Sequence, residues 1–499
     1  MTHHWTVITL LIYITCQLSD AKHNKREDLI RNEALLTLGG NTTLTDKEAE
    51  VNNCLMRHKF AEVNYAFDNP QYFNFSRHFF DYKDEIRDSK VYKIIKDLPK
   101  GAALHVHDMG ILSPDYLMNI TYKSNLYACF DKDKVNLKFA NNIPAIPCGA
   151  KWQLMSEART SSGDVKKFDA ELRKHFTLVV NDPDKVYPCI KDTWDTFMKY
   201  FFTVQPMLSH RPIWEEYFYD ALKLFREHNI MYVEVRSVLP NLYELDGTVY
   251  DPLITAKAYK KTIERFKKDH PDFYGAKLIY APPRKVDRKT LDEYLKLARR
   301  IKQDMTEAFA GFDLVGQEDL GTPLIEFVPQ LSAAKDLDYF FHAGETDWYG
   351  CLTDENLVDA ILLGAKRLGH AYALPKHPLL IKEVLDRNIG LEVNVISNAV
   401  LSLLRDVRNH PLATFLAQNL PVVLSSDDPG VWEADPVSDD FYVAFVGVAS
   451  RLSDLRMLKE LAINSLKYSA FSAQERENAF KRFNNQWYTF INNFKCSKY

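Results

Sequence analysis

Two histidines stand two residues apart at the end of a short apolar run. His105 and His107 close the segment ALHVH (103–107), and Asp108 follows them directly. Side chains two positions apart in an extended strand point to the same face of a sheet. Both imidazoles can therefore reach one cavity, which is the geometry that a metal ion needs from a pair of histidine ligands.

Histidines and carboxylates also end other short apolar runs of the chain. They are His342 and Glu345 in YFFHAGE, His370 in RLGHAYA, and Asp427 and Asp428 in VVLSSDD. Each motif is weak alone, because a single histidine is usually packed in a core and an Asp-Asp pair usually lies in a turn or a helix cap. Three imidazoles and one carboxylate together suit one Zn²⁺ with an open position for water, and the candidate ligands are His105, His107, His342 and Asp427.

The remaining acidic and basic side chains fit hydrolysis at such a metal. Glu345 can donate a proton to a substrate nitrogen, and His370 can orient the attacking water and take its proton. Asp428, beside a candidate ligand, can hold the substrate. This combination indicates metal-assisted attack of water on an electron-poor carbon, with protonation of a ring nitrogen and loss of an amine.

The sequence favours a single metal ion. The run GFDLVG (311–316) ends without the lysine that would bridge two ions, although Glu318 and Asp319 follow it and could compete for that role. The chain has no C-x-x-C motif, which excludes the zinc deaminase chemistry that combines H-x-E with P-C-x-x-C.

Eight short apolar runs must position these residues. They are 103–107, 230–239, 276–281, 311–316, 339–345, 367–373, 389–397 and 421–428. Most intervals contain an amphipathic stretch, and buried strands that alternate with helices predict a parallel sheet. Eight such units predict a closed (β/α)8 barrel with the active site at the carboxyl ends of the strands; a doubly wound open sheet is the alternative.

The rest of the chain divides around this barrel. We expect a signal peptide over 1–21, a helical arm over 22–97, the barrel over 98–440 with an inserted subdomain over 115–185, and packed C-terminal helices over 441–499. The insert is expected because the interval after the first run is too long for one loop and one helix. The arm either packs on a partner subunit or caps its own domain.

Composition points to an extracellular enzyme. The 12-residue apolar run WTVITLLIYITC is too short to span a bilayer and suits a signal peptide. Sequons at Asn41, Asn74 and Asn119 agree with secretion, and the few cysteines allow one or two disulfides. The 63 basic and 67 acidic residues nearly balance, and no basic block is present, so nucleic acid and membranes are not expected partners.

Several motifs resemble the adenosine/AMP deaminase group, and most closely the secreted adenosine deaminase-related growth factors, also called adenosine deaminase type two. The segments are KGAALHVHD, AGFDLVGQED, YFFHAGETDW, RLGHAYALPKHP, EVNVISNAVL, RNHPLAT and LSSDDPG. The resemblance implies a (β/α)8 barrel, a dimerising N-terminal arm and a homodimer. It also implies an insert of the receptor-binding type, with a cell-surface receptor or glycan as partner, held by a Cys129–Cys148 disulfide.

The resemblance also implies roles for individual residues. Zinc would be bound by His105, His107, His342 and Asp427. Glu345 would donate a proton to N1 of the purine, His370 would be the acid/base on the attacking water, and Asp428 would contact the purine. Gly316 would meet the base through its backbone N–H. The ribose side would be lined by Asp108 and by the stretch from Trp194 to Phe201.

The sequence departs from the family pattern at a few positions. Pro283 stands where relatives often have a histidine, which removes a polar contact to the substrate. Gln317 replaces another common histidine, and Asn394-Val395 replaces a familiar pair. None of these changes removes a candidate ligand or catalytic group.

The expected function is therefore extracellular deamination of adenosine, with 2′-deoxyadenosine as a further candidate substrate. One alternative is a growth-factor-like signalling protein that acts through its insert with little or no catalysis. Another is a related hydrolase of a different aminopurine, a nucleotide or a pterin. A nucleotide is disfavoured because the sequence offers no basic cluster for a phosphate.

Overall fold

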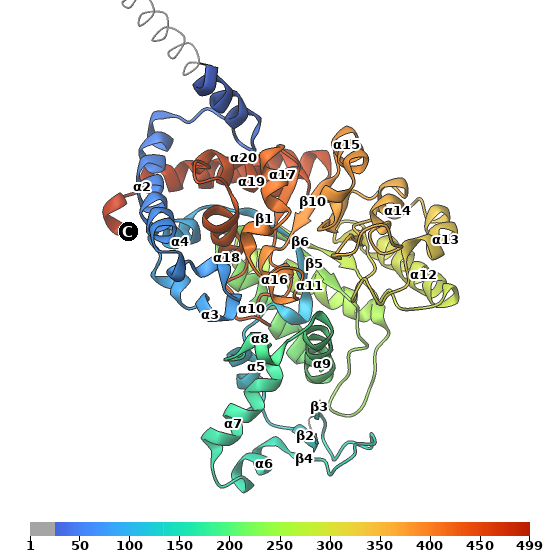
Figure 1. Cartoon of the computed structure of the whole chain (residues 1–499). Coiled ribbons are helices and arrows are strands. Elements are labelled where there is room, and N and C mark those ends of the chain that lie inside the picture. Colours follow the sequence, from blue (N-terminus) through green and yellow to red (C-terminus); the bar gives the residue numbers. More distant parts are fainter. Residues whose placement is uncertain (1–24, 133) are drawn as a thin grey trace, which may run out of the picture.

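A ring of parallel strands forms the centre of the computed structural model, which describes residues 25–132 and 134–499 (Figure 1). Its eight strands are β1 Gly101–His107, β5 Ile230–Ser237, β6 Gly275–Tyr280, β7 Phe309–Phe312, β8 His342–Ala343, β9 Arg367–His370, β10 Gly390–Val393 and β11 Val422–Leu424. All eight lie within or overlap the apolar runs of the sequence. The predicted α/β barrel fold is confirmed.

The strands pair in chain order around the ring. One half is β1-β5-β6-β7 and the other is β8-β9-β10-β11, and all the pairs within them are parallel. Parallel bridges between Phe312 and Tyr339 and between Val106 and Asp427 join the halves at both seams. The second bridge places the end of the last strand beside the histidine pair of the first.

Helices that follow the strands in sequence cover the outside of the ring. They are α10 Arg211–Glu227, α11 Pro252–Asp269, α12 Arg288–Asp304, α13 Val328–Ala333, α14 Asn356–Leu362, α15 Pro378–Asp386, α17 Leu412–Ala417 and α19 Leu455–Lys467. The strands are buried on both faces, as parallel strands under helices must be, and this explains their continuous apolar sequences.

One strand is shorter than the sequence suggests. The run 389–397 was expected to be extended throughout, but β10 ends at Val393 and helix α16 spans Val395–Val400. The side chain of Asp440 accepts a hydrogen bond from the backbone N–H of Ile396 at 3.1 Å. A carboxyl group from a distant segment thus satisfies a free N–H of the first helical turn, which local sequence cannot reveal.

An N-terminal helical arm packs against the C-terminal helices. Residues 25–36 are helical, and α2 Asp46–Asp68, α3 Phe79–Tyr82 and α4 Lys90–Asp97 follow. Helix α2 begins with a capping box between Thr45 and Glu48 and contacts α19 and the last long helix, α20 Ala473–Asn493. Cys54 of α2 forms a disulfide with Cys496. The segment 1–21, expected to be a signal peptide, lies outside the described residues.

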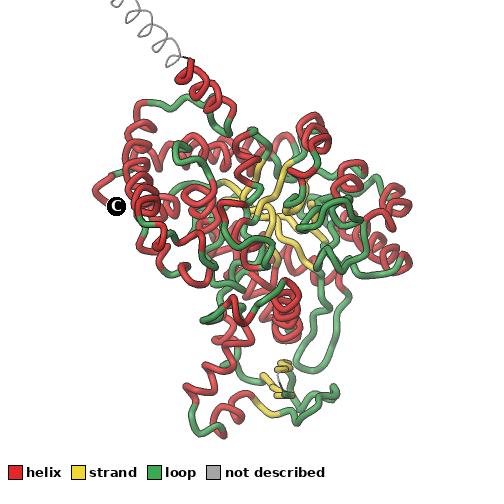
Figure 2. The backbone as a smooth tube through the Cα atoms, in the orientation of Figure 1, coloured by secondary structure: helices red, strands yellow, loops and turns green. Residues whose placement is uncertain are grey.

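A subdomain projects from the barrel between β1 and β5 (Figure 2). It contains α5 Pro114–Ile120, β2 Leu126–Asp131, β3 Lys134–Phe139, β4 Gln153–Leu154, α6 Met155–Ser161, α7 Val165–Arg173 and α8 Pro183–Val186. Its three strands form a small antiparallel sheet in the order β3-β2-β4. Cys129 and Cys148 form a disulfide within it. Helix α9 Ile190–Leu208 then leads back to the barrel.

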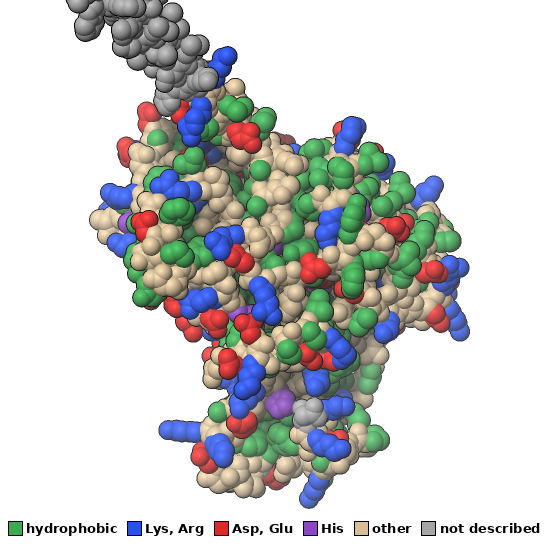
Figure 3. Space-filling view, viewed as in Figure 1, with side chains coloured by type: hydrophobic (Ala, Val, Ile, Leu, Met, Phe, Trp, Pro, Cys, Tyr) green, Lys and Arg blue, Asp and Glu red, His purple; other side chains and the backbone are tan. Residues whose placement is uncertain are grey.

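The visible surface carries no large region of one charge. Acidic and basic side chains are interspersed over the face seen in Figure 3. Across the described part of the chain, the structure contains no helix with the length and apolarity needed to cross a bilayer.

Candidate active site

Four side chains converge at the carboxyl ends of the strands. His105 and His107 come from β1, His342 from β8 and Asp427 from the segment after β11, and each has one ligand atom within 4.8 Å of those of the other three. The Nε2 atoms of His105 and His342 are 3.1 Å apart, and Asp427 Oδ1 is 3.1 Å from His107 Nε2. The structure thus brings together all four candidate ligands.

Buried carboxylates fix the orientation of two of these histidines. His105 Nδ1 is 2.7 Å from Glu392 Oε2, and His342 Nδ1 is 2.7 Å from Asp313 Oδ2. Each carboxylate accepts a hydrogen bond from the Nδ1–H group of its histidine. The unprotonated Nε2 atom, with its lone pair, therefore faces the shared centre. The carboxylates are joined by Arg236, which donates to both.

These contacts fit a bound cation. Two Nε2 lone pairs that face each other at 3.1 Å repel unless a positive charge lies near them, and burial lowers the pKa of His342 to about 3, which keeps its imidazole neutral. Among the described residues, one other group has metal-like spacing, namely Cys54, His58 and Cys496. The sulfur atoms of its two cysteines are joined in a disulfide and are not free to bind a metal.

Asp313, Glu392 and Arg236 are not among the residues that the sequence predicts for the site. Asp313, Glu392 and Arg236 lie in or just after β7, β10 and β5, and all three are buried completely. A charged residue inside a buried strand is rarely tolerated without a partner. The charged letters in GFDLVG, LEVNV and VEVRS were therefore a usable signal, although sequence alone does not say which groups they meet.

Glu345 and His370 lie side by side next to the four candidate ligands. His370 Nδ1 is 3.6 Å from Glu345 Oε1, and His370 Nε2 is 3.7 Å from Asp427 Oδ2. Burial, with the nearby negative charges of Asp427 and Glu318, raises the pKa of Glu345 well above its usual value. This shift favours the protonated form of Glu345, in which the side chain can act as an acid.

The backbone at two of these positions is in the left-handed region. His370 has a φ of 60° and Asp427 a φ of 57°. Non-glycine residues seldom adopt this conformation, and where they do the surrounding structure must hold them there. His370 is the last residue of β9 and Asp427 lies three positions after the end of β11, and both strands are short and fully buried, which supplies that support.

Two further carboxyl groups line the cavity. Burial and the adjacent Asp427 raise the pKa of Asp428, which favours its protonated form, and its buried Oδ1 has no hydrogen-bond partner among the described residues. Asp108 accepts a hydrogen bond from the hydroxyl of Tyr259 at 2.7 Å. An unpaired buried polar atom is costly unless a ligand or water meets it, so Asp428 Oδ1 marks a point of ligand contact.

The cavity has a volume of about 460 Å³ and a largely aromatic wall. Trp194 and Phe201, both expected to line the substrate, project into it from α9. Pro283, Val315 and Gly316 also line it, and a β-bridge joins Pro283 and Val315. Gly316 has a φ of 102°, which favours glycine at this position. A flat, mostly apolar ligand of nucleoside size fits this space.

Glu318 braces the loop that carries Glu345. Its carboxylate accepts hydrogen bonds from the backbone N–H groups of Gly344 and Glu345 at 2.9 and 2.7 Å. Asn356 donates to the same carboxylate at 2.7 Å. Glu318 is therefore committed to the loop backbone and is not among the four convergent ligands.

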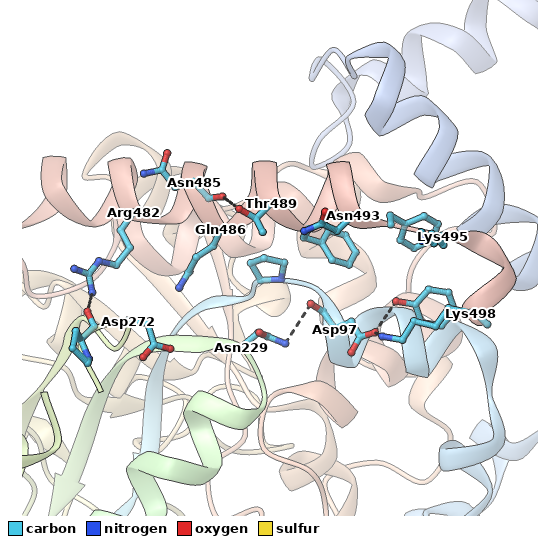
Figure 4. Close-up of a pocket in the computed structure, with 15 residues that line it drawn as sticks. Asp97, Asn229, Asp272, Arg482, Asn485, Gln486, Thr489, Asn493, Lys495 and Lys498 are labelled. Atoms are coloured by element: carbon cyan, nitrogen blue, oxygen red, sulfur yellow. Dashed lines mark hydrogen bonds and ion pairs between the residues drawn. The ribbon is translucent and has the colours of Figure 1, made fainter. Parts of the chain in front are cut away.

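A second cavity, of about 670 Å³, lies at the opposite end of the barrel (Figure 4). Pro99, Asn229 and Asp272, which line it, come shortly before β1, β5 and β6. Asp97 there contacts Lys498 and Tyr499, and Arg482 donates to the carbonyl of Pro271. The amino ends of barrel strands usually serve stability, and this cavity holds no histidine or convergent set of acids.

Comparison with known proteins agrees with this geometry. A family model described as "Adenosine deaminase" matches residues 172–485, and one described as "Adenosine/AMP deaminase N-terminal" matches residues 3–95. The adenosine deaminase of Aedes albopictus is 42% identical over 470 residues, which are 93% of this chain and 87% of that protein. Adenosine deaminase 2 of Homo sapiens is 38% identical over 474 residues, 93% and 92% of the two chains.

The chain belongs to the adenosine deaminase 2 family. Its deaminase domain and its near full-length relatives make it a deaminase, a hydrolase of carbon–nitrogen bonds. The solved structure of an adenine deaminase from Arthrobacter aurescens covers 78% of this chain and 99% of its own, with a TM-score of 0.56 and 17% identity. At that identity the likeness concerns the fold, and it agrees with the α/β barrel. The four convergent ligands fit the metal dependence of adenosine deaminases.

Proposed function

We propose that this protein is a secreted, zinc-dependent adenosine deaminase that converts adenosine and water into inosine and ammonia. The observation that carries the proposal is the convergence of His105, His107, His342 and Asp427 beside the buried carboxyl group of Glu345, in a cavity of nucleoside size. Three neutral nitrogens and one carboxylate oxygen are the donor set that suits zinc. The aromatic wall on α9 suits a purine.

A cation held by these four residues supplies a Lewis acid that brings the pKa of a bound water toward neutrality. The protein's own groups place the other reactants. Glu345, which is protonated, donates to a ring nitrogen of the purine and so makes the neighbouring carbon more electrophilic. Asp428, also protonated, donates from its unpaired side to a second purine nitrogen. His370 orients the attacking water from beside Asp427.

The walls around these groups exclude bulk water and select the substrate. Trp194 and Phe201 cover the sugar side together with Asp108. Arg236 is the one lysine or arginine among the residues that line the cavity, and its guanidinium is engaged by Asp313 and Glu392. A phosphate would find no free cation there, which favours a nucleoside such as adenosine or 2′-deoxyadenosine over a nucleotide.

Secretion is proposed from the N-terminal apolar run, the sequons and the two disulfides. Asn41 and Asn119 are exposed and open to a glycan, whereas the side chain of Asn74 is half-buried and donates to Glu85 at 2.9 Å. Removal of extracellular adenosine is the consequence of catalysis in that location.

A homodimer is proposed because the N-terminal arm exposes large apolar side chains. Large apolar side chains that remain exposed there are Leu29, Leu35, Leu36, Phe67 and Tyr72. Several exposed apolar residues on neighbouring helices are typical of an interface. The insert, where Ile143 and Ile146 are exposed beside the Cys129–Cys148 disulfide, is the proposed contact for a cell-surface receptor or glycan.

The test of the catalytic proposal is direct. Purified protein is mixed with adenosine, and the adenine absorbance is followed before and after removal of the metal with a chelator. We expect conversion to inosine that is lost with the metal and restored by zinc. Metal-replete protein that leaves adenosine unchanged would overturn the proposal.

Glu345→Gln tests the proton donor. The amide keeps the shape of the side chain but has no acidic proton, so we expect kcat to fall by about 10²–10⁴-fold, the usual contribution of a general acid. Zinc content, measured by atomic absorption, should not change. Full activity in this variant would remove Glu345 from the mechanism.

A further inference from the structure

A chain of hydrogen bonds runs from His370 away from the cavity into the core. Asn398 Nδ2 lies 3.0 Å from His370 Nδ1, and Asn398 Oδ1 lies 3.0 Å from His410 Nε2. The last hydrogen bond in this series is donated by the backbone N–H of Leu412 to His410 Nδ1, at 2.9 Å. His370, Asn398 and His410 are all at most 2% exposed, so water does not compete for these contacts.

The direction of every bond in this chain is set by its last member. A backbone N–H can only donate, so His410 Nδ1 must be an unprotonated acceptor, and the single proton of this imidazole lies on Nε2. Burial lowers the pKa of His410 to about 3, in agreement with a neutral ring. His410 Nε2–H therefore donates to Asn398, which must present its oxygen.

The orientation of Asn398 then decides the state of His370. With its oxygen on His410, the amide presents its N–H to His370 Nδ1, which must accept. The carboxyl group of Glu345 is farther from this nitrogen, at 3.6 Å. The proton of neutral His370 is left on Nε2, the nitrogen that faces Asp427 Oδ2 at 3.7 Å.

We propose that Asn398 and His410 are positioning residues that hold His370 in the Nε2–H tautomer, so that it donates a hydrogen bond to the attacking water. This inference rests on the proposed function of His370 and changes the expectation drawn from the sequence. His370 Nε2 already carries hydrogen and has no lone pair for the proton of the water, so this proton passes instead to the carboxylate of Asp427, whose Oδ2 lies 3.7 Å from the same nitrogen. Its role is to hold the oxygen of that water in line with the purine carbon.

This chain of hydrogen bonds also gives a role to two sequence motifs that have no other role in the proposed function. Asn398 stands in EVNVISNAVL and His410 in RNHPLAT. Asn398 lies in α16, the short helix that replaces the end of the expected strand, and His410 lies just before α17. Neither side chain lines the cavity. They act on the reaction through His370 and are not themselves catalytic residues.

The tautomer can be observed directly, without any substrate. Neutron diffraction from crystals of the wild-type protein exchanged into heavy water should place deuterium on Nε2 of His370 and on Nε2 of His410, and none on either Nδ1. Deuterium on Nδ1 of His370 would overturn the proposal. This result does not depend on turnover, so it stands apart from a failure of the adenosine assay.

Asn398→Asp tests the effect on the reaction. A carboxylate accepts from both histidines, so it draws the proton of His370 to Nδ1 and removes the donor that faces the water. Loss of outer-sphere partners usually costs 10–100-fold, and a wrong histidine tautomer costs about 10⁴-fold in a serine protease. We expect kcat to fall by about 100-fold, with KM changed by less than about threefold and with zinc content unchanged.

Two companion variants separate tautomer control from packing. In His410→Gln, the glutamine N–H can still donate to Asn398 and preserve the direction of the chain, so the loss in kcat should be under about tenfold. Asn398→Ala leaves both tautomers open and should fall between the other two. Equal losses in all three variants, or none in Asn398→Asp, would contradict the proposal. Thermal unfolding identifies a variant that does not fold, and the neutron result then decides.

Discussion

At the scale of single residues, the site is built from pairs of histidines and buried carboxylates. Asp313 contacts both the backbone N–H and the Nδ1 of His342, at 2.9 and 2.7 Å, and Arg236 keeps it charged. Burial acts to raise the pKa of Asp313, but the charge of Arg236 and the hydrogen bonds from Arg236 and His342 outweigh it and hold this pKa far below its usual value. A permanent carboxylate therefore fixes the proton of His342 on Nδ1 and leaves Nε2 for a metal.

Asp313→Asn should weaken the metal site without removing a ligand. The amide still accepts from His342 but carries no charge, so we expect metal affinity to fall by about 10–100-fold. Competition with a coloured chelator measures this. Glu234→Gln is the matched control, because Glu234 is an equally buried strand carboxylate that pairs with Arg367 and contacts no candidate ligand. A similar loss in both variants would attribute the effect to general destabilisation.

At the scale of elements, the contacts of helix α2 hold the N-terminal arm on the barrel. Glu48 of α2 accepts hydrogen bonds from Lys459 of α19 at 2.6 Å and from the indole N–H of Trp487 of α20 at 2.7 Å. It also completes the cap of its own helix with Thr45. One carboxylate thus joins three helices. Two of its partners, Lys459 and Trp487, lie more than 400 positions from Glu48 in the sequence.

These bonds make the stability of the arm depend on pH. Burial acts to raise the pKa of Glu48, but the bond to Lys459 and the cap outweigh it and lower the pKa from 4.5 to about 2. The unfolded chain therefore binds more protons between these values, so Glu48 stabilises the fold above pH 4.5 and loses this effect as the pH falls toward 2.

Glu48→Gln should remove this dependence. We expect the wild type to be more stable than the variant by about 2–3 kcal/mol at pH 6, and the difference to shrink by more than half at pH 3. Urea unfolding at the two pH values measures it. A difference that stays constant with pH would mean that the charge of Glu48 does not stabilise the arm.

At the scale of the whole molecule, a disulfide joins the N-terminal arm to the C-terminal segment. The Cys54–Cys496 disulfide joins positions 442 residues apart and ties the C-terminal segment to α2. The second disulfide closes a span of only 19 residues inside the insert. Because a disulfide restricts the unfolded chain more when it closes a longer loop, the first one constrains the unfolded molecule more strongly.

Replacing both Cys54 and Cys496 with serine should lower the free energy of unfolding by about 2–5 kcal/mol, as expected for loss of a native disulfide. The candidate active site and this disulfide lie at opposite ends of the barrel strands. Turnover at 25 °C should therefore be unaffected. Cys189→Ser is the control, since Cys189 is exposed and in no disulfide. Denaturant unfolding measures the change, and unaltered stability in the double variant would show that the disulfide does not constrain the unfolded chain.

The fold and the types of residue at its centre can be predicted from the amino-acid sequence alone. Alternation in β1 put His105 and His107 on one face, and the repeated strand–helix pattern placed His342, His370 and Asp427 at one end of a barrel. These are consequences of local periodicity, in which neighbours along the chain set the direction of a side chain. Strand ends were harder to predict, as β10 shows, because Asp440 from a distant segment stabilises the helix that follows it.

The partners that distant residues contact are visible only in the folded structure. Glu392 is 287 positions from His105, Cys496 is 442 from Cys54, and Asn398 is 28 from His370. A sequence pattern shows that such a residue is buried, but not which partner satisfies it. The pairing follows from the closure of the sheet, which brings distant strand ends within hydrogen-bond distance. Those pairings fix the proton on each histidine, and so they decide what each histidine can do.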